Sequence, residues 1–351
     1  MKNFFKILSV NILIVLTTLS LIEIFFGYWF DENNLGPYVR EHRMRKASYI
    51  VNYEGKSYDF IYKRNYHAFR GADVPLKDIS AVIMGGSTTD ERYKPDKYTI
   101  TEILNKKISK TKNDIRIYNA GIEGQSTRGH ISNLKYWFPK LKDFKPKYIL
   151  YYIGINDQYA NKGLRNEFQD GNILSESYTE RILDNIKSRS IFYDLLRKLK
   201  HRYHKSDKKL LYDFDEGIKK YKQNNPEFLS YKEFIKNNSL EEVLLKYKEL
   251  TEVYTARIDK LHAETIKMGS IPIFINQLTA KGFNNSKLVA LNSSLIIHCK
   301  KNKYHYIDVA SNLEGKLDFW WDGIHTTPKG SKEIADIIAP QLIKIFEDTN
   351  K

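Results

Sequence analysis

The hydrophobic positions of the chain follow two patterns, one at the N-terminus and one that repeats from residue 79 onward. Residues 7–26 are mainly Leu, Ile, Val and Phe, and the apolar character continues to Phe30. From Ile79, short apolar runs that are typical of buried parallel strands alternate with helical stretches. The first pattern predicts one membrane-crossing helix, and the second predicts an α/β domain.

Five apolar runs are the predicted strands of this domain, at residues 81–85, 115–118, 148–153, 271–275 and 304–307. Helices are predicted between and after them, at about 97–110, 128–141, 242–267, 286–301 and 328–346. Thr327 and Pro328 suit the N-cap and first position of the last helix. The alternation predicts a flavodoxin-like three-layer α/β/α sandwich with a five-stranded parallel sheet, and a site at the carboxyl ends of the strands.

The chain therefore divides into three predicted parts. Residues 1–30 form a membrane anchor, residues 31–78 a polar, aromatic-rich connector, and residues 79–350 the α/β domain. Within this domain, residues 160–245 contain charged and aromatic helical segments and no convincing strand. We interpret this stretch as a helical insertion or cap.

The N-terminal segment is long enough to cross a bilayer. A helix from Ile7 to Phe30 would span roughly 36 Å, against a hydrocarbon core of ~30 Å. Lys2 and Lys6 precede the segment and acidic residues follow it, so the positive-inside rule predicts a cytoplasmic N-terminus and an exported, periplasmic or extracellular, domain. A cleaved signal peptide is the alternative, but the apolar run is longer than usual and no small-x-small cleavage site follows it.

Composition narrows the possible partners. The net charge is +15, but the lysines are spread along the whole chain, and neither zinc-finger spacing nor an RNA-binding signature accompanies them. A lysine-rich surface is therefore the preferred interpretation, and no nucleic-acid partner is predicted. The single cysteine, Cys299, excludes an internal disulfide and a CxxC metal site, and its apolar neighbours predict a core thiol.

Three turns follow the first three predicted strands, at the edge where a site is expected. In the first, Gly85-Gly86-Ser87, a serine on a tight turn is exposed and its N–H can stabilise an oxyanion. The second turn, residues 119–127 (NAGIEGQST), has glycines that let the backbone turn an N–H inward. The third contains Asn156, whose side-chain amide can donate to the same oxygen. Each turn alone also fits ordinary turn chemistry, and the first also fits a phosphate-binding loop.

A fourth motif, WWDGIHTTP at residues 320–328, precedes the last predicted helix. Asp322 lies three residues before His325, so its carboxylate can accept from the imidazole Nδ1–H. That bond leaves Nε2 free to take a proton from a serine. An ordinary helix-entry loop is the alternative for this motif alone, and a third protein ligand for a metal is missing nearby.

The four motifs in this order resemble the SGNH, or GDSL-like, hydrolase family over about 79–346, outside the insertion. The resemblance implies a serine hydrolase acting on ester bonds, with Ser87 as nucleophile, His325 as base and Asp322 as its orienter. It also implies an oxyanion hole formed by the N–H groups of Ser87 and Gly124 and by the side chain of Asn156. It implies no metal and no organic cofactor.

One position departs from the family pattern. The usual Gly-Asp-Ser-Leu is Gly85-Gly86-Ser87-Thr88 here, a variant in which the serine remains and the preceding carboxylate does not. Gln125, Arg128 and Trp321 are weak candidates for substrate contacts, and Trp321 fits core packing as well as sugar stacking.

The expected activity is hydrolysis of acyl esters, with acetyl favoured, through an acyl-serine intermediate. Export together with the family resemblance favours an acylated cell-surface carbohydrate as substrate. A polysaccharide O-acyltransferase with the same triad is the alternative, as is a lipase or lysophospholipase acting on a lipid. A non-catalytic glycan-binding or assembly subunit is a third hypothesis. The sequence leaves the oligomeric state open.

Overall fold

The centre of the molecule is a five-stranded sheet. The computed structural model describes residues 2–31, 43–112, 115–159, 178–204, 209–224 and 227–349. The sheet has the order β4-β3-β5-β7-β8 and every neighbouring pair is parallel. Its strands are β3 (Ala81–Gly85), β4 (Ile117–Asn119), β5 (Tyr148–Tyr152), β7 (Ile271–Ile275) and β8 (His305–Ile307). This order confirms the predicted flavodoxin-like sheet.

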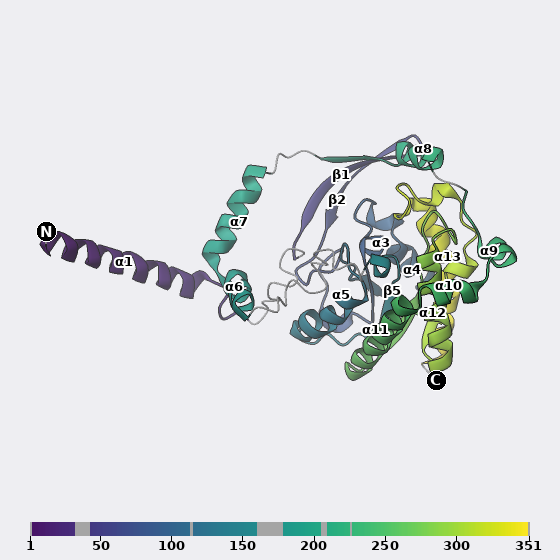
Figure 1. Ribbon diagram of the computed structural model, residues 1–351. Coiled ribbons are helices and arrows are strands. Elements are labelled where there is room, and N and C mark those ends of the chain that lie inside the picture. The colour runs from purple at the N-terminus through teal and green to yellow at the C-terminus, as the bar shows by residue number, and fades with distance from the viewer. Residues whose placement is uncertain are drawn as a thin grey trace.

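Helices cover both faces of this sheet, as Figure 1 shows. Helices α4 (Ile100–Ile108) and α13 (Pro328–Asp348) pack on one face. The other face is covered mainly by α5 (Thr127–Ser132), α11 (Lys248–Lys267) and α12 (Ser286–Asn302). Helix α13 begins after its N-cap Thr327, as predicted. The three-layer sandwich is thus confirmed.

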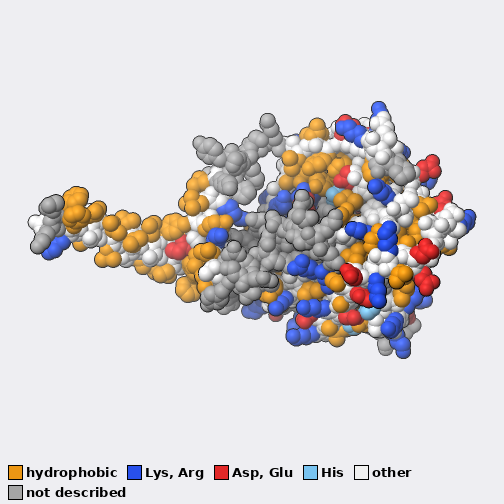
Figure 2. Space-filling model, viewed as in Figure 1, with side chains coloured by type: hydrophobic (Ala, Val, Ile, Leu, Met, Phe, Trp, Pro, Cys, Tyr) orange, Lys and Arg blue, Asp and Glu red, His pale blue; other side chains and the backbone are white. Residues whose placement is uncertain are grey.

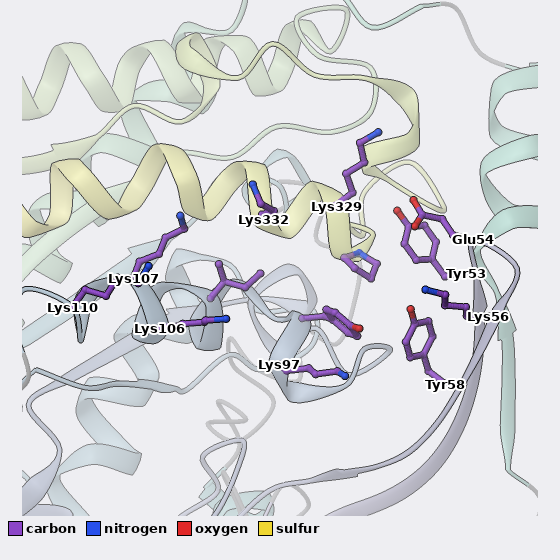
Figure 3. A pocket seen from close by; sticks show the side chains of 13 residues that line it. Tyr53, Glu54, Lys56, Tyr58, Lys97, Lys106, Lys107, Lys110, Lys329 and Lys332 are labelled. Atoms are coloured by element: carbon purple, nitrogen blue, oxygen red, sulfur yellow. The ribbon is translucent and has the colours of Figure 1, made fainter.

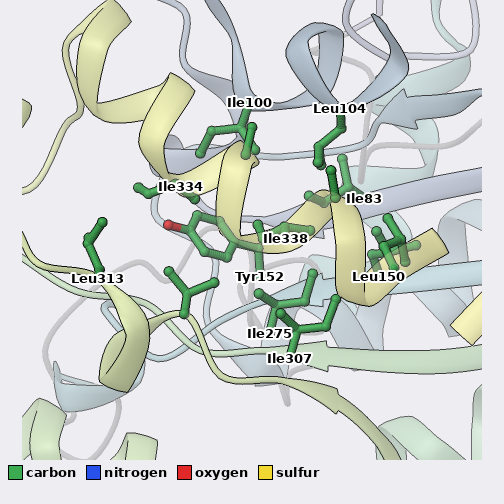
Figure 4. Close-up of a cluster of buried hydrophobic side chains, with 14 of the residues drawn as sticks. Ile83, Ile100, Leu104, Leu150, Tyr152, Ile275, Ile307, Leu313, Ile334 and Ile338 are labelled. Atoms are coloured by element: carbon green, nitrogen blue, oxygen red, sulfur yellow. The ribbon is translucent and has the colours of Figure 1, made fainter. Parts of the chain in front are cut away.

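Successive residues of each strand pack alternately into the two layers of the core, because neighbouring side chains of a strand point to opposite faces of the sheet. Ile83, Leu150 and Ile275 meet α4 and α13 on one side, as Figure 4 shows. Their neighbours Val82, Ile149 and Phe274 lie in the cluster under α11 and α12. Cys299 lies in that second cluster, so the predicted core thiol is confirmed, and burial raises the pKa of its thiol to about 12.

Two predicted helices are interrupted. The helix expected at 128–141 is α5 followed by a π-helical turn at Asn133–Trp137 and a 3-10 turn at Phe138–Lys140. Pro139 lies in the last of these turns and lacks the N–H that a regular helix needs. The helix expected at 242–267 is split at Tyr247 into α10 (Leu240–Lys246) and α11. The spacing of apolar residues stays helical across Tyr247, so it cannot reveal a helix break that is one residue long.

A second, smaller sheet joins the two parts of the chain that lie outside the α/β pattern. Strands β1 (Lys46–Tyr53) and β2 (Lys56–Lys63) form a hairpin within the predicted connector. Strand β6 (Leu210–Asp213), from the predicted insertion, pairs with β1 in parallel. The expectation of no strand in 160–245 was therefore wrong. Four residues are too few to show an alternating pattern, and β6 gains its hydrogen bonds from a strand far away in sequence.

The small sheet packs against the main domain through an aromatic cluster. Tyr49, Tyr62 and Phe214 are buried in it, and Trp321 packs against it. The described part of the insertion also contains helices α6 (Tyr178–Arg189), α7 (Ile191–His204), α8 (Phe214–Asn224) and α9 (Tyr231–Asn237) and most of α10. The insertion is thus partly integrated with the main domain, and the division at residues 30 and 78 remains a prediction.

Helix α1 (Lys2–Phe26) carries exposed apolar side chains along its length, visible in Figure 2. Its segment Asn3–Phe26 is long and apolar enough to cross a membrane, a property that signal sequences share. The helix ends at Phe26, four residues before the end of the predicted anchor. There the Glu23 carboxylate accepts hydrogen bonds from the Trp29 indole and from the backbone N–H of Ile191, at the start of α7.

Candidate active site

Two consecutive glycines shape the turn that presents Ser87. Strand β3 ends at Gly85, and the short helix α3 (Ser87–Asp90) begins directly after Gly86. A Cβ on Gly85 would clash with the Thr89 hydroxyl and lie 2.7 Å from the Tyr152 carbonyl oxygen. A Cβ on Gly86 would clash with the Asn156 side-chain nitrogen. The variant motif therefore leaves room for Asn156 beside the serine.

Asp322 and His325 lie in a tight loop that the backbone closes on itself. The N–H of Trp321 donates to the carbonyl of His325 at 3.0 Å. Gly323, between them, has φ +94°, and a Cβ there would lie 2.5 Å from the ring of Tyr221. This left-handed conformation favours glycine over any other residue. The loop thus folds Asp322 back toward the backbone of the residues that follow it.

The structure brings Ser87, Asp322 and His325 together. His325 Nε2 lies 2.8 Å from Ser87 Oγ, and His325 Nδ1 lies 2.6 Å from Asp322 Oδ2. Asp322 Oδ1 accepts the N–H groups of Ile324 at 3.1 Å and His325 at 2.8 Å. The arrangement can hold the imidazole with a proton on Nδ1 and leave Nε2 to accept one from the serine.

Electrostatics favour an ionised Asp322. Burial acts to raise its pKa, but the hydrogen bonds and charge of His325 and the two backbone N–H groups outweigh it, so the pKa is lowered overall. The imidazole is 15% exposed and the carboxylate 29%, so substrate and water can still reach this pair. A carboxylate that stays ionised can stabilise the imidazolium formed during proton transfer.

The predicted oxyanion donors lie on three neighbouring loops. The Asn156 side-chain nitrogen donates to the Gln125 carbonyl at 2.8 Å, and the amide has a second N–H to offer. Gly124 is exposed and has φ +78°. Within the described residues, the N–H groups of Ser87 and Gly124 have no hydrogen-bond partner. Unpaired N–H groups beside a nucleophile can stabilise an oxyanion.

Two side chains tie these loops to each other. Asp157 Oδ1 accepts the N–H of Thr127 at 3.0 Å and its hydroxyl at 2.6 Å, which joins the loop after β5 to the start of α5. The Gln277 side chain donates to the Thr88 hydroxyl and to the Tyr152 carbonyl, at 2.9 and 3.0 Å. The carboxyl ends of β3, β5 and β7 are therefore locked together around the serine.

A buried ion pair, which the sequence motifs did not predict, lies directly beneath the His325 loop. Glu91 and Lys94 are 3% and 2% exposed. The Lys94 ammonium contacts Glu91 Oε1 at 2.5 Å and donates to the hydroxyls of Thr326 and Ser331. Thr326 follows His325 in the chain. Burial lowers the pKa of Lys94, and Glu91 acts against that shift.

A second buried charge supports the serine turn from the small sheet. Arg64 is 1% exposed and donates to Asp90 Oδ1 at 2.9 Å and to the Gly121 carbonyl at 2.7 Å. Tyr62 also donates to Asp90 Oδ1, at 2.8 Å. The charged run 90–94, directly after a buried strand and turn, was the only signal in the sequence for either network. Arg64 binds Asp90 and Gly121, which are far from it in sequence, so no local pattern predicts these contacts.

The three weak substrate candidates have different surroundings. Gln125 is 2% exposed, and its side-chain amide donates to Asn133 at 3.0 Å, a position that does not support a substrate contact. Arg128 is exposed in the first turn of α5. Trp321 stacks between Phe214 and the ring of His325, at centroid distances of 4.9 and 5.9 Å, so it braces the imidazole.

This geometry, a serine, histidine and aspartate at the carboxyl ends of a parallel sheet, defines the class of serine hydrolases. Residues 82–338 match the family model of the GDSL-like lipases and acylhydrolases. The chain belongs to this family and is a serine hydrolase acting on ester bonds. The family assignment confirms the resemblance noted in the sequence. A search of curated proteins finds no match.

The chain is also similar to solved structures of low identity. One is the psychrotrophic esterase EstA from Pseudoalteromonas, at 12% identity and TM-score 0.43, covering 76% of this chain and 99% of that one. Another is an acetylxylan esterase from Geobacillus stearothermophilus, at 12% and 0.41, covering 75% and 93%. A third is a GDSL-like lipase from Bacteroides thetaiotaomicron, at 13% and 0.39, covering 78% and 92%. The assignment rests on the family match over residues 82–338.

The buried pair yields a prediction about stability. Lys94→Met leaves the Glu91 carboxylate buried without its cation, which should lower the free energy of unfolding by about 3–5 kcal/mol. The double variant Glu91→Gln/Lys94→Met removes both charges and should recover most of that loss, as urea unfolding of the purified protein would show. A single variant as stable as the wild type would contradict the role assigned to the pair.

Proposed function

We propose that Ser87 is the nucleophile of this hydrolase, with His325 as base and Asp322 as its orienter. His325 Nε2 takes the proton of Ser87 as Oγ attacks the ester carbonyl. The N–H groups of Ser87 and Gly124 and the Asn156 amide stabilise the resulting oxyanion. The C–O bond then breaks, His325 returns the proton to the leaving alcohol, and water releases the acyl group by the same route. The observation that carries this proposal is the 2.8 Å contact between His325 Nε2 and Ser87 Oγ.

We propose a short acyl group, acetyl, as the group transferred to the serine. The cavity that contacts Ser87, His325 and Trp321 directly has a volume of about 10 Å³. That is room for one water molecule or for little more than the methyl end of an acetyl group, and a fatty chain would need space that this cavity does not offer. The size of the cavity thus favours an esterase of short acyl groups over a lipase.

The proposed substrate is an acylated carbohydrate at the cell surface. In support, α1 has the length and composition of a membrane anchor, and basic Lys2 and Lys6 precede the acidic Asp31. By the positive-inside rule this charge distribution supports a hydrolase domain outside the cytoplasm, where acylated glycans are found. An O-acyltransferase with the same triad would deliver the acetyl group to a glycan hydroxyl instead of to water.

The triad can be tested against a matched pair elsewhere in the chain. Asp322→Asn should lower kcat for a short-chain ester by about 10⁴-fold, because the amide favours the wrong imidazole tautomer. Asp259 and His298 form a similar contact, 2.6 Å between Asp259 Oδ1 and His298 Nε2, on α11 and α12. Asp259→Asn should therefore leave kcat unchanged. The assay should measure free acetate and acetylated acceptor separately. More acetylated acceptor than free acetate would favour the O-acyltransferase over the esterase.

Folded Ser87→Ala protein that still turns over the short-chain ester at near the wild-type rate would refute the proposed nucleophile. Circular dichroism and the urea midpoint of the variant provide the check on folding.

The oxyanion hole gives an independent prediction. Asn156→Ala removes one donor to the transition-state oxygen and should lower kcat by about 10²–10³-fold. KM should change little, because the developing negative charge exists only in the transition state. A rise in KM at constant kcat would assign Asn156 to ground-state binding instead.

The proposed topology predicts where a protease can reach the chain. Protease added outside intact cells or spheroplasts should digest the hydrolase domain, while an N-terminal epitope tag stays protected. A domain that is cleaved only after the membrane is broken would contradict export. Release of the domain into the medium without α1 would indicate a cleaved signal peptide.

A further inference from the structure

A large lysine-lined pocket lies apart from the triad, between the small sheet and the helices of one face. Its volume is about 610 Å³, within the ~300–1,000 Å³ typical of ligand sites. Figure 3 shows that three parts of the chain converge on it: the turn of the β1–β2 hairpin, the segment that ends in α4, and the start of α13. Seven of its thirteen lining residues are lysines, and Glu54 is the one acidic residue among them.

Four of these lysines have no carboxylate partner in the part of the chain that the structure describes: Lys56, Lys97, Lys106 and Lys110. The other three are paired, since Lys107 and Lys332 share Asp336 and Lys329 contacts Asp318. The four unpaired lysines are all exposed. The pocket therefore has an excess of positive charge, since Glu54 is the one acidic side chain in its lining and four lysines have no carboxylate partner among the described residues.

Aromatic rings line the same pocket. Tyr58 and Tyr98 lie edge to face, with ring centroids 5.5 Å apart, and the Lys97 ammonium lies 4.8 Å from the centroid of Tyr98. Tyr53, at the end of β1, also lines the pocket but is only 5% exposed, so Tyr58 and Tyr98 are the rings available to a ligand. Rings beside ammonium groups that have no carboxylate partner in the described part of the chain offer apolar surface and positive charge together. This combination suits a sugar ring that carries an acidic group.

The pocket adjoins the loop that carries His325. Pro328 and Lys329 line it. Pro328 is three residues after His325 in the chain, so their Cα atoms lie at most about 11 Å apart. Tyr53 also contacts Phe214, which stacks on Trp321 behind the imidazole. A chain bound in the pocket would thus lie near the wall of the active site.

We propose that this pocket binds an anionic glycan chain, one whose sugar units carry carboxylate or phosphate groups. The unpaired lysines contact the acidic groups and the tyrosines contact the sugar rings. The idea that this pocket holds the polymeric substrate rests on the function proposed above. The binding of an anionic glycan to the pocket does not depend on that function. The tyrosine rings beside the lysines favour a sugar chain over a lipid headgroup, and anionic vesicles are the competing ligand in the test below.

Binding can be measured on the full-length protein in detergent by titration with polygalacturonate, which carries a carboxylate on each sugar. Lys106→Ala/Lys110→Ala should raise Kd at least tenfold. The control Lys300→Ala/Lys301→Ala removes the same charge from exposed positions in the last turn of α12, on the other face of the sheet, and should change Kd less than twofold. Fully methyl-esterified polygalacturonate should bind weakly, because it has lost its charges.

A second comparison separates sugar recognition from charge alone. Tyr58→Leu keeps an apolar side chain but removes the aromatic ring, and should weaken binding of polygalacturonate several-fold while leaving poly-L-glutamate unaffected. Turnover of a short acetyl ester by the same variants reports on folding and on the triad. Normal turnover with lost binding in the pocket variants would support the pocket. Wild-type protein that binds the polymer but turns over no ester would refute only the proposed function.

Three results would overturn the proposal. Equal losses in the pocket variant and the α12 control would show that net charge alone attracts the polymer. Tighter binding to an oligonucleotide or to anionic lipid vesicles, lost in the same pocket variant, would assign the pocket to another class of partner. Absence of saturable binding to polygalacturonate in wild-type protein with normal esterase turnover would remove the site altogether.

Discussion

The short contact between His325 and Ser87 is the constraint on which the rest of the structure depends. The two residues are far apart in sequence, yet Nε2 and Oγ must lie within hydrogen-bond distance, here 2.8 Å. A proton can pass between them only over such a distance, and a displacement of about 1 Å costs orders of magnitude in rate. The sheet brings the serine loop and the oxyanion loops together, because the carboxyl ends of its parallel strands lie at one edge.

Buried polar contacts then hold the serine turn and the His325 loop in place. Lys94 and Glu91 bind the residue after His325, and Arg64 binds Asp90 in the turn that begins with Ser87. Removing one partner of a buried pair is costly, so these contacts resist small movements of either loop. The small sheet belongs to the same framework, since Arg64 directly follows β2 and the aromatic cluster of the sheet lies behind Trp321. The connector before the α/β pattern and the insertion within it thus help to hold the site.

Much of this arrangement could be predicted from local sequence. The strands 81–85 and 271–275 end at the predicted residues, and the motifs around Ser87, Asn156 and His325 follow strands or precede a helix as expected. The buried ion pairs could not be predicted, because Arg64 and Asp90 meet only through tertiary packing. Strand β6 was missed for the same reason, since four residues gain their hydrogen bonds from a distant partner. The lysine-lined pocket likewise gathers three segments that no local pattern connects.

The most direct test of the account is covalent labelling with a serine-directed fluorophosphonate, followed by peptide mass spectrometry. The contact between His325 and Ser87 predicts one label per protein, on Ser87, and almost none in a folded His325→Ala variant, because a serine hydroxyl is a poor nucleophile without its base. A label on another residue, or undiminished labelling of Ser87 in His325→Ala, would contradict the central claim.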